Sequence, residues 1–454
     1  MSKKVIVIGS GPGGYPAALR LKALGAEVSI AEMGDFGGTC LNRGCIPSKA
    51  FLDTAHRAHV FGGLRGLMKD GENFTFTPDM LDWEKIKARR ADVVSRIRVS
   101  LEKMFQMKKI PVLRGKAFFS APGEVTVKNG DAETKYAYDA AVLASGTKPA
   151  FPPPFNTNLD LITDSDRVFD LPEKPGSVLI VGAGVIGLEF ACFFNALGIP
   201  VTVLEVLPAL LPNEDPQVAR AVKTSFEKRG IAFIFGKKAM SVSAEGKIKT
   251  VVLEDGTRLA ADTVLVGAGR AADLGGTGLD KVGLEWNRKG VKVSPDMKTA
   301  ADNIYAVGDV NGLSLLAHSA TRQGEIAAEN IMGGHRVFDA NIVPRCIYAW
   351  PETASVGVNK SQAEAGGLQV KTSRAFFLGV GRAVASGETE GFVQLVYGAE
   401  DDVIIGAQIV GGPATEMIHL LALAVKLKLR RRDLKEMIFA HPTMSEAINE
   451  ALEK

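Results

Sequence analysis

The 454-residue sequence is poor in cysteine, nearly balanced in charge and free of long apolar runs. Four cysteines are too few for the disulfide framework of a small secreted protein. The 54 Lys and Arg residues against 51 Asp and Glu leave a net charge of +3, which does not indicate a nucleic-acid-binding surface. No stretch reaches the roughly 18 apolar residues that cross a bilayer.

We also expect no export signal at the N-terminus. Its apolar run, residues 5–8, is too short for a signal peptide and leads directly into a glycine turn. We therefore expect a cytoplasmic protein that binds neither membranes nor nucleic acids. The chain instead has 49 glycines and a 46% share of hydrophobic residues, and its length favours roughly two to four globular domains.

Residues 5–32 and 178–205 share one pattern, which is a β-rich run, a G-x-G-x-x-G turn, a helix, and a second strand ending in an acidic residue. The acidic residues are Glu32 and Glu205, at the same distance from the first glycine of each turn. The glycines are Gly9, Gly11 and Gly14 in the first segment, and Gly182, Gly184 and Gly187 in the second.

This spacing suits a pyrophosphate, because the three glycines allow a tight turn, close approach of the ligand, and close packing of helix on strand. A glycine turn alone is common, but here each turn has its strand, helix and acidic residue. We predict two dinucleotide-binding units. Glu205 favours NAD over NADP, since a carboxylate repels a 2′-phosphate and residues 206–208 include no Arg or Lys.

Cys40 and Cys45 lie in the stretch C-L-N-R-G-C-I-P-S-K, where two thiols could close a small disulfide ring. Pro47 fits the first turn of a helix, which would place Cys45 at a helix N-terminus that stabilises a thiolate. A metal site would need two further ligands, and Cys192, in a predicted helix, and Cys346, in an apolar strand, form no second close pair. An inert pair of core cysteines is the other alternative.

The stretch from residue 37 to residue 49 resembles the redox loop of the flavin-dependent pyridine nucleotide–disulfide oxidoreductases, and its sequence is most similar to that of the dihydrolipoyl dehydrogenases. The resemblance implies that the first unit binds FAD and the second NAD. It implies that Cys40 exchanges with substrate and that Cys45 contacts the flavin. Lys49 would lie beside the flavin, paired with Glu189.

The string from His441 to Glu446 resembles the family motif His-Pro-Thr-x-Ser-Glu. The resemblance implies that His441 is the catalytic base and that Glu446 holds its ring. In the family this histidine reaches the redox disulfide of the other subunit, which implies a homodimer. By contrast, we expect His419, on an apolar helical face, to be a packing residue.

Further motifs resemble the family's second flavin motif at residues 304–310 and its crossover segment at residues 144–147. The cofactor-binding positions that the resemblance implies are Gly9, Gly11, Gly14, Glu32, Thr39, Lys49, Ala117, Ser145, Gly146, Gly182, Gly184, Gly187, Glu189, Glu205, Gly269, Asp309 and Ala317. Three features depart from the family or are variable in it: residues 271–276 replace the usual Pro-Asn, Asp35-Phe36 precede the glycine pair, and Arg43 lies inside the ring. Arg43 could bias which disulfide is accepted, or be simply solvated.

The predicted fold is α/β, with two Rossmann-like domains and a C-terminal α+β dimerisation domain. The predicted limits are 1–147 for the first part of the FAD-binding domain, 148–266 for the NAD-binding domain, 267–339 for the second FAD-binding part, and 340–454 for the interface domain. Short strands at 391–397 and 403–409 and a helix at 415–429 are expected in the last part. The arginines 430–432 are expected to be a solvated helix end rather than a partner contact.

The resemblance implies an NAD⁺-dependent enzyme that reoxidises a protein-bound dihydrolipoyl group through a Cys40–Cys45 disulfide and FAD. Its partner would be the lipoyl-bearing domain of a 2-oxo acid dehydrogenase or a glycine-cleavage-type complex. Two alternatives stay open. One is the same mechanism on another disulfide, as in the glutathione reductases, and the other is a flavoprotein that serves as a structural or binding subunit.

Overall fold

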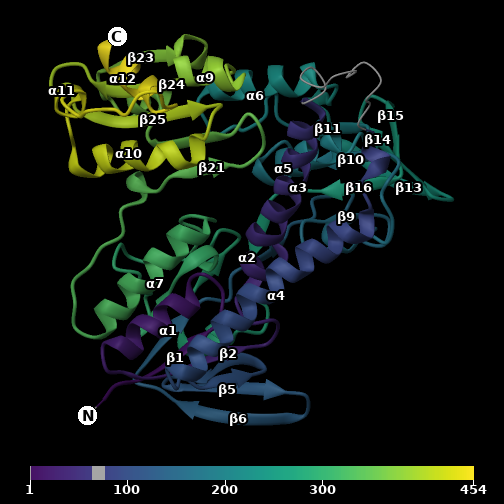
Figure 1. The fold of residues 1–454 in the computed structure, drawn as a ribbon. Coiled ribbons are helices and arrows are strands. Elements are labelled where there is room, and N and C mark those ends of the chain that lie inside the picture. Colours follow the sequence, from purple (N-terminus) through teal and green to yellow (C-terminus); the bar gives the residue numbers. More distant parts are fainter. Residues whose placement is uncertain (1, 64–76) are drawn as a thin grey trace.

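The computed structural model describes residues 2–63 and 77–454, and its three large sheets lie in separate parts of the molecule (Figure 1). The first sheet is parallel and has five strands. In spatial order the strands are β20 (Ile304–Ala306), β7 (Ala140–Leu143), β1 (Lys4–Ile8), β2 (Glu27–Glu32) and β3 (Val112–Arg114).

The central strand β1 is buried on both faces, as a parallel sheet covered on both sides requires. Val5 and Val7 belong to the core beneath α1 (Gly14–Ala23) and α7 (Ala317–Ile331). Ile6 and Ile8 point to the opposite core, which the sequence analysis did not anticipate. That core lies under an antiparallel sheet of β4 (Lys116–Ala121), β5 (Glu124–Asn129) and β6 (Ala132–Ala137).

The second large sheet repeats the architecture of the first. Its strands in spatial order are β9 (Thr163–Asp164), β16 (Thr263–Val266), β10 (Val178–Val181), β11 (Val201–Glu205) and β12 (Ala232–Phe235). The helix α5 (Val185–Ala196) follows the second glycine turn, and α6 (Pro216–Lys228) follows β11. A second antiparallel sheet consists of β13 (Ala239–Glu245), β14 (Ile248–Leu253) and β15 (Arg258–Ala261).

Two short strands connect the two parallel sheets. β8 (Thr147–Pro149) leaves the first sheet and pairs antiparallel with β17 (Arg270–Ala272), on the return path. The chain then supplies β20 to the first sheet. The domain limits derived from the sequence stay predictions. The predicted crossover out of the first sheet and the predicted return to it lie side by side, because they form the β8–β17 pair.

The third large sheet is antiparallel and lies at the C-terminal end of the chain (Figure 1). Its order is β21 (Arg345–Ile347), β22 (Thr353–Gly357), β25 (Ile404–Val410), β24 (Phe392–Gly398) and β23 (Val370–Phe376). The helices α10 (Ala414–Leu427) and α12 (Glu446–Glu453) share its core. Among the described residues, no helix is both long and apolar enough to span a membrane.

Two expectations for α10 were wrong. The helix ends at Leu427, because Lys428 adopts a left-handed backbone with φ of 53° and the next N–H bonds back to the Ala424 carbonyl at 2.9 Å. His419 is exposed rather than packed, with Nδ1 3.2 Å from the Glu416 carbonyl. The buried face of the helix contains Met417, Ile418, Leu421 and Ala424, and His419 lies off that face.

Of the arginines 430–432, Arg430 and Arg432 are exposed, as expected of a solvated stretch, whereas Arg431 is half-buried and makes contacts. These arginines lead into a short helix, α11 (Arg431–Lys435). The Arg431 guanidinium is 2.8 Å from an Asp402 carboxylate oxygen and lies 3.9 Å from the centroid of the Tyr397 ring. The central arginine of the triplet therefore fastens α11 to the C-terminal sheet.

Candidate active site

Each glycine turn connects the central strand of a parallel sheet to the helix that follows it. A Cβ at Gly14 would lie 1.8 Å from the Gly9 carbonyl oxygen, and one at Gly187 would lie 2.0 Å from that of Gly182. The third glycine therefore allows the helix to approach the strand. A Cβ at the middle glycine of the second turn, Gly184, would meet no described atom within 4 Å. That open side is where a dinucleotide could approach the backbone.

The acidic residues that end β2 and β11 are held in the same way. One carboxylate oxygen of Glu32 accepts from the Ser10 N–H at 2.9 Å, and one of Glu205 accepts from the Ala183 N–H at 2.7 Å. The other oxygen of each accepts from the N–H two residues farther along the chain, at 2.7 and 2.9 Å. Both carboxylates are thus fixed beside a glycine turn, at the place where a ribose would need an acceptor.

The cysteine pair spans the junction of two helices. Cys40 lies in α2 (Gly38–Arg43), and α3 (Cys45–Gly63) begins at Cys45. Pro47 occupies the first turn of α3, as the sequence indicated. Neither cysteine takes part in a disulfide in the structure, so the protonation described for the pair is that of its dithiol form. Its other two cysteines are Cys192 in α5 and Cys346 in β21, and burial raises the pKa of each thiol to about 11.

The two thiols of the pair differ in their protonation. A hydrogen bond from Cys40 lowers the pKa of Cys45, and the nearby Lys49 ammonium acts in the same direction against the effect of burial. The pKa of Cys40 is raised, first by its hydrogen bond to Cys45 and then by burial. The reduced pair therefore holds its negative charge on Cys45 while Cys40 keeps its proton.

Lys49 connects the redox helix to the second dinucleotide unit. Its Nζ lies 2.9 and 2.8 Å from the two carboxylate oxygens of Glu189, which is buried in α5. Tyr348, which no sequence motif indicated, lies with its ring centroid 4.5 Å from the same Nζ. The sequence carries little information about this contact, because Tyr348 is distant from Lys49 in the chain and belongs to no recognised motif.

Asp309 lies in a short 3-10 helix, η6 (Gly308–Asn311), directly after β20. Burial raises the pKa of its carboxyl group. Among the described residues, only the Thr147 hydroxyl donates to the side chain, at 2.8 Å. A buried carboxylate with one donor fits a ligand hydroxyl as a second donor. The residues at this sheet therefore fit the ribityl chain of FAD.

The other predicted cofactor-binding positions lie on several different elements. Thr39 is in α2, Ala117 is in β4, Ser145 and Gly146 directly precede β8, Gly269 directly precedes β17, and Ala317 is the first residue of α7. The Ser145 hydroxyl donates to the Asp273 carbonyl at 3.0 Å, so the unusual 271–276 segment is tied to the crossover.

The two other departures from the family pattern have partners in the structure. Arg43 Nε is 3.9 Å from an Asp166 oxygen, and Asp166 also pairs with Arg270 at 3.0 Å. The Asp35 carboxylate is 2.7 Å from Arg98. Arg43 is therefore neither fully solvated nor isolated, although half of its side chain stays exposed.

The imidazole of His441 is oriented by a carboxylate on the following helix. Its Nδ1 is 2.9 Å from one oxygen of Glu446, whose other oxygen accepts from the Thr443 N–H at 2.9 Å. The hydrogen bond from His441, followed by that from Thr443, lowers the pKa of Glu446. The His441 side chain is 76% exposed. In the described parts of the chain it makes no hydrogen bond or ion pair with Cys40 or Cys45.

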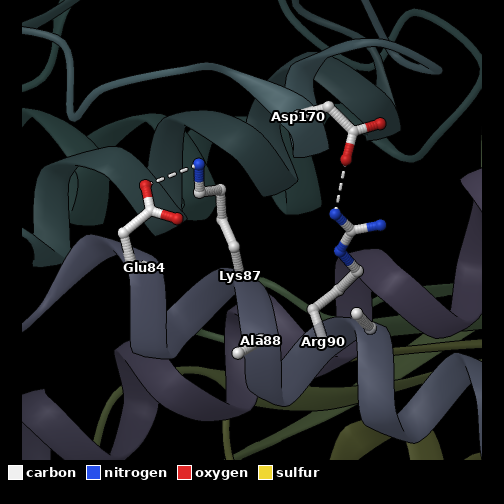
Figure 2. A pocket seen from close by; sticks show the side chains of 6 residues that line it. Glu84, Lys87, Ala88, Arg90 and Asp170 are labelled. Atoms are coloured by element: carbon white, nitrogen blue, oxygen red, sulfur yellow. Dashed lines mark hydrogen bonds and ion pairs between the residues drawn. The ribbon is translucent and has the colours of Figure 1, made fainter.

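A shallow groove lies away from these residues, between α4 (Trp83–Met107) and η4 (Val168–Asp170) (Figure 2). Its charged side chains neutralise one another, because Lys87 pairs with Glu84 at 2.7 Å and Arg90 pairs with Asp170 at 2.6 Å. No predicted site residue lines it. We do not regard it as a substrate site.

Comparison with known proteins gives a consistent result over nearly the whole chain. Residues 3–324 match the model of the pyridine nucleotide-disulphide oxidoreductase family, and residues 343–452 match that of the family's dimerisation domain. The chain is 35% identical to the dihydrolipoyl dehydrogenase of Geobacillus stearothermophilus, over 99% of this chain and 95% of the relative. It is 36% identical to that of Thermus scotoductus, over 99% and 96%.

Two solved structures have the same fold. LpdA of Mycobacterium tuberculosis superimposes with a TM-score of 0.92 at 26% identity, covering 99% of both chains. The HOCl-induced flavoprotein disulfide reductase RclA of Escherichia coli gives a TM-score of 0.88 at 26% identity, again over 99% of both chains. The predicted class, with two Rossmann-like domains and a C-terminal dimerisation domain, is confirmed.

The division of charge within the cysteine pair predicts a difference in reactivity. In the reduced protein stripped of its flavin, so that the flavin does not shield Cys45, Cys45 should react with iodoacetamide at lower pH than Cys40, because only a thiolate is alkylated and the pKa of Cys45 is the lowered one. Labelling at a series of pH values, quantified for each cysteine peptide by mass spectrometry, measures this. Earlier labelling of Cys40 would contradict the assignment.

Proposed function

The chain belongs to the pyridine nucleotide-disulphide oxidoreductase family, and we propose that it reoxidises a protein-bound dihydrolipoyl group at the expense of NAD⁺. It is a flavoprotein of the dihydrolipoyl dehydrogenase type, and its cofactors are FAD and NAD(H). The observation that carries the proposal is the cysteine pair at the junction of α2 and α3. Cys45 begins α3 one turn before Lys49, whose ammonium is held by the Glu189 carboxylate at 2.8 to 2.9 Å.

The thiol chemistry follows from the unequal pKa values of the two cysteines. One substrate thiolate attacks Cys40 of the oxidised pair, the Cys40–Cys45 bond breaks, and Cys45 departs as a thiolate. The low pKa of Cys45 makes it the better leaving group. The second substrate thiolate then attacks the mixed disulfide, which closes the lipoyl ring and releases Cys40. Bound FAD supplies the two-electron connection between the reduced pair and the nicotinamide.

His441 is the proposed base that takes the protons of the substrate thiols. Its hydrogen bond to Glu446 fixes the ring and stabilises the charged imidazolium that forms. Since this imidazole has no contact with the cysteines of its own chain in the described residues, we propose that it serves the cysteine pair of a second copy. The working unit is then a homodimer, and the match to a dimerisation domain supports it.

Exposed apolar side chains in the C-terminal part of the chain support the same arrangement. Ile438 is 94% exposed, and Leu423 and Leu427 on α10 are about half exposed. A second copy would remove these side chains from water. We further propose that the dihydrolipoyl substrate is carried by a lipoyl-bearing domain of a 2-oxo acid dehydrogenase or glycine-cleavage-type complex. A cytoplasmic location belongs to the same proposal, because a reducing compartment keeps the other cysteines as thiols.

The substrate assignment is tested by two assays on the purified holoenzyme. We expect turnover of dihydrolipoamide with NAD⁺, and none of oxidised glutathione with NADPH. Cys45→Ser should abolish the first reaction, because no leaving thiolate remains, whereas Cys346→Ser is the matched control that should keep it. Unchanged NADH turnover by Cys45→Ser with the physiological acceptor would rule out the dithiol mechanism, and preferential turnover of glutathione would favour the alternative substrate.

Cofactor choice is tested at Glu205. The value of kcat/KM should be more than about tenfold higher for NADH than for NADPH, because a fixed carboxylate repels a 2′-phosphate and like-charge contacts cost several kcal/mol. Glu205→Gln should narrow the ratio, mainly by raising the NADPH value. Equal values for the two nucleotides in the wild-type enzyme would contradict the assignment.

The proposed base is tested at His441 and Glu446. His441→Gln should lower kcat with dihydrolipoamide by roughly 10²- to 10⁴-fold, the usual contribution of general acid–base catalysis. Glu446→Gln should lower it less, since the histidine is still present. Reduction of the flavin by NADH, followed by stopped-flow absorbance, should persist in both variants. The control is the exposed His335→Gln; an equal loss in this control would remove the argument for His441.

A further inference from the structure

The Lys49 ammonium has two neighbours of different chemistry. The carboxylate of Glu189 lies 2.8 to 2.9 Å from Nζ, and the ring centroid of Tyr348 lies 4.5 Å from it. A cation this close to an aromatic face is attracted by the ring quadrupole, and the attraction grows as the pair loses water. Only a third of the Lys49 side chain is exposed, so the contact is partly shielded from solvent.

The position of Tyr348 is tied to the same ion pair. Its backbone N–H donates to Glu189 Oε1 at 3.1 Å, and that oxygen also accepts from Lys49. Two residues farther on, the Trp350 carbonyl accepts from the Arg229 guanidinium, which lies over the Trp350 and Phe226 rings. The backbone contacts of Tyr348 with Glu189 and of Trp350 with Arg229 therefore hold this segment in place beside α5.

The ring acts as a neutral phenol. Burial, helped by the neighbouring Cys346 and Glu189, raises the pKa of Tyr348 to about 12. At physiological pH the residue contributes no charge of its own to Lys49, and an effect on the ammonium must come from the aromatic face. This distinguishes its part from that of Glu189, which contributes a full negative charge.

We propose that Tyr348 is a positioning residue for the redox pair, whose ring holds the Lys49 ammonium one helical turn from Cys45. The inference rests on the proposed function, because it assigns Tyr348 a part in the same dithiol reaction. Lys49 follows Cys45 by four residues in α3, so the two side chains share a helix face. Without the ring, Lys49 could turn toward water and its charge would stabilise the Cys45 thiolate less.

The test compares variants at position 348 in the reduced full-length protein stripped of its flavin, so that the flavin expected against Cys45 does not block the reagent. The pH dependence of Cys45 alkylation by iodoacetamide is measured from peptide mass spectra for Tyr348→Leu, Tyr348→Met and Tyr348→Phe. We expect the Leu and Met variants to slow labelling near neutral pH by roughly three- to tenfold, part of the effect that an adjacent opposite charge has on a pKa. Tyr348→Phe, which keeps the ring, should restore the wild-type profile. Lys49→Met sets the upper limit of the effect.

The outcomes separate a positioning part from packing alone. Leu and Met variants with the wild-type labelling profile would overturn the inference, even if one of them were less stable. Equal slowing in Leu, Met and Phe variants would also overturn it, because the phenol rather than the ring would then matter. Two non-aromatic variants are used so that misfolding of one leaves the other to decide.

Failure of this inference is distinguishable from failure of the proposed function. Alkylation of Cys45 requires neither dihydrolipoamide nor NAD⁺. If the wild-type enzyme does not oxidise dihydrolipoamide but the Leu and Met variants still slow alkylation, the substrate assignment fails and the part played by Tyr348 stands. If dihydrolipoamide is oxidised and alkylation is unchanged, the reverse holds.

Discussion

The contact between Lys49 and Glu189 is the constraint on which the geometry of the site depends. Lys49 lies in the helix that begins at Cys45, and Glu189 lies in the helix that begins after the second glycine turn. Separating the two helices would leave a buried carboxylate without its cation, which is strongly unfavourable. The ion pair therefore fixes the position of the cysteine pair relative to the second dinucleotide unit, although the two come from different parts of the chain.

Around this contact, the two parallel sheets present equivalent sites. In each sheet the strand before the glycine turn is central, and the strand that ends in an acidic residue lies beside it. Ligands of such sheets bind at the carboxyl ends of the strands. The short β8–β17 pair joins the sheets close to Thr147 and Arg270, where Arg270 Nε donates to the Thr147 hydroxyl at 2.9 Å. The Asp309 carboxylate accepts from that hydroxyl, so the crossover and the predicted flavin site share one hydrogen-bond chain.

The sequence predicted those features whose cause is local. The predicted strands 178–181 and 201–205 agree with β10 and β11, because a short continuous apolar run and the neighbouring glycine turn are both encoded in consecutive residues. The exposure of His419 could not be obtained in this way, since many side chains around it are apolar and only the packing of α10 on its sheet selects the buried face. The role of Tyr348 could not be predicted for a related reason: its partner Lys49 is distant in sequence, and the contact arises only when the segment after β21 meets α3.

The charge on the cysteine pair depends on its redox state. The hydrogen bond that Cys40 donates to Cys45 requires a protonated Cys40, so it can exist only after the disulfide has opened. The first attack by substrate leaves Cys40 in a mixed disulfide, so the departing Cys45 thiolate is stabilised by Lys49, which is already in place on the same helix face. The Cys40 donor forms only when the second substrate thiolate has released Cys40 and Cys40 has taken up a proton. Closing the bond removes both the donor and the negative charge, and it leaves the Lys49 ammonium balanced by Glu189 alone. The ion pair therefore keeps the buried charges balanced in the oxidised state, while the same ammonium favours the thiolate in the reduced one.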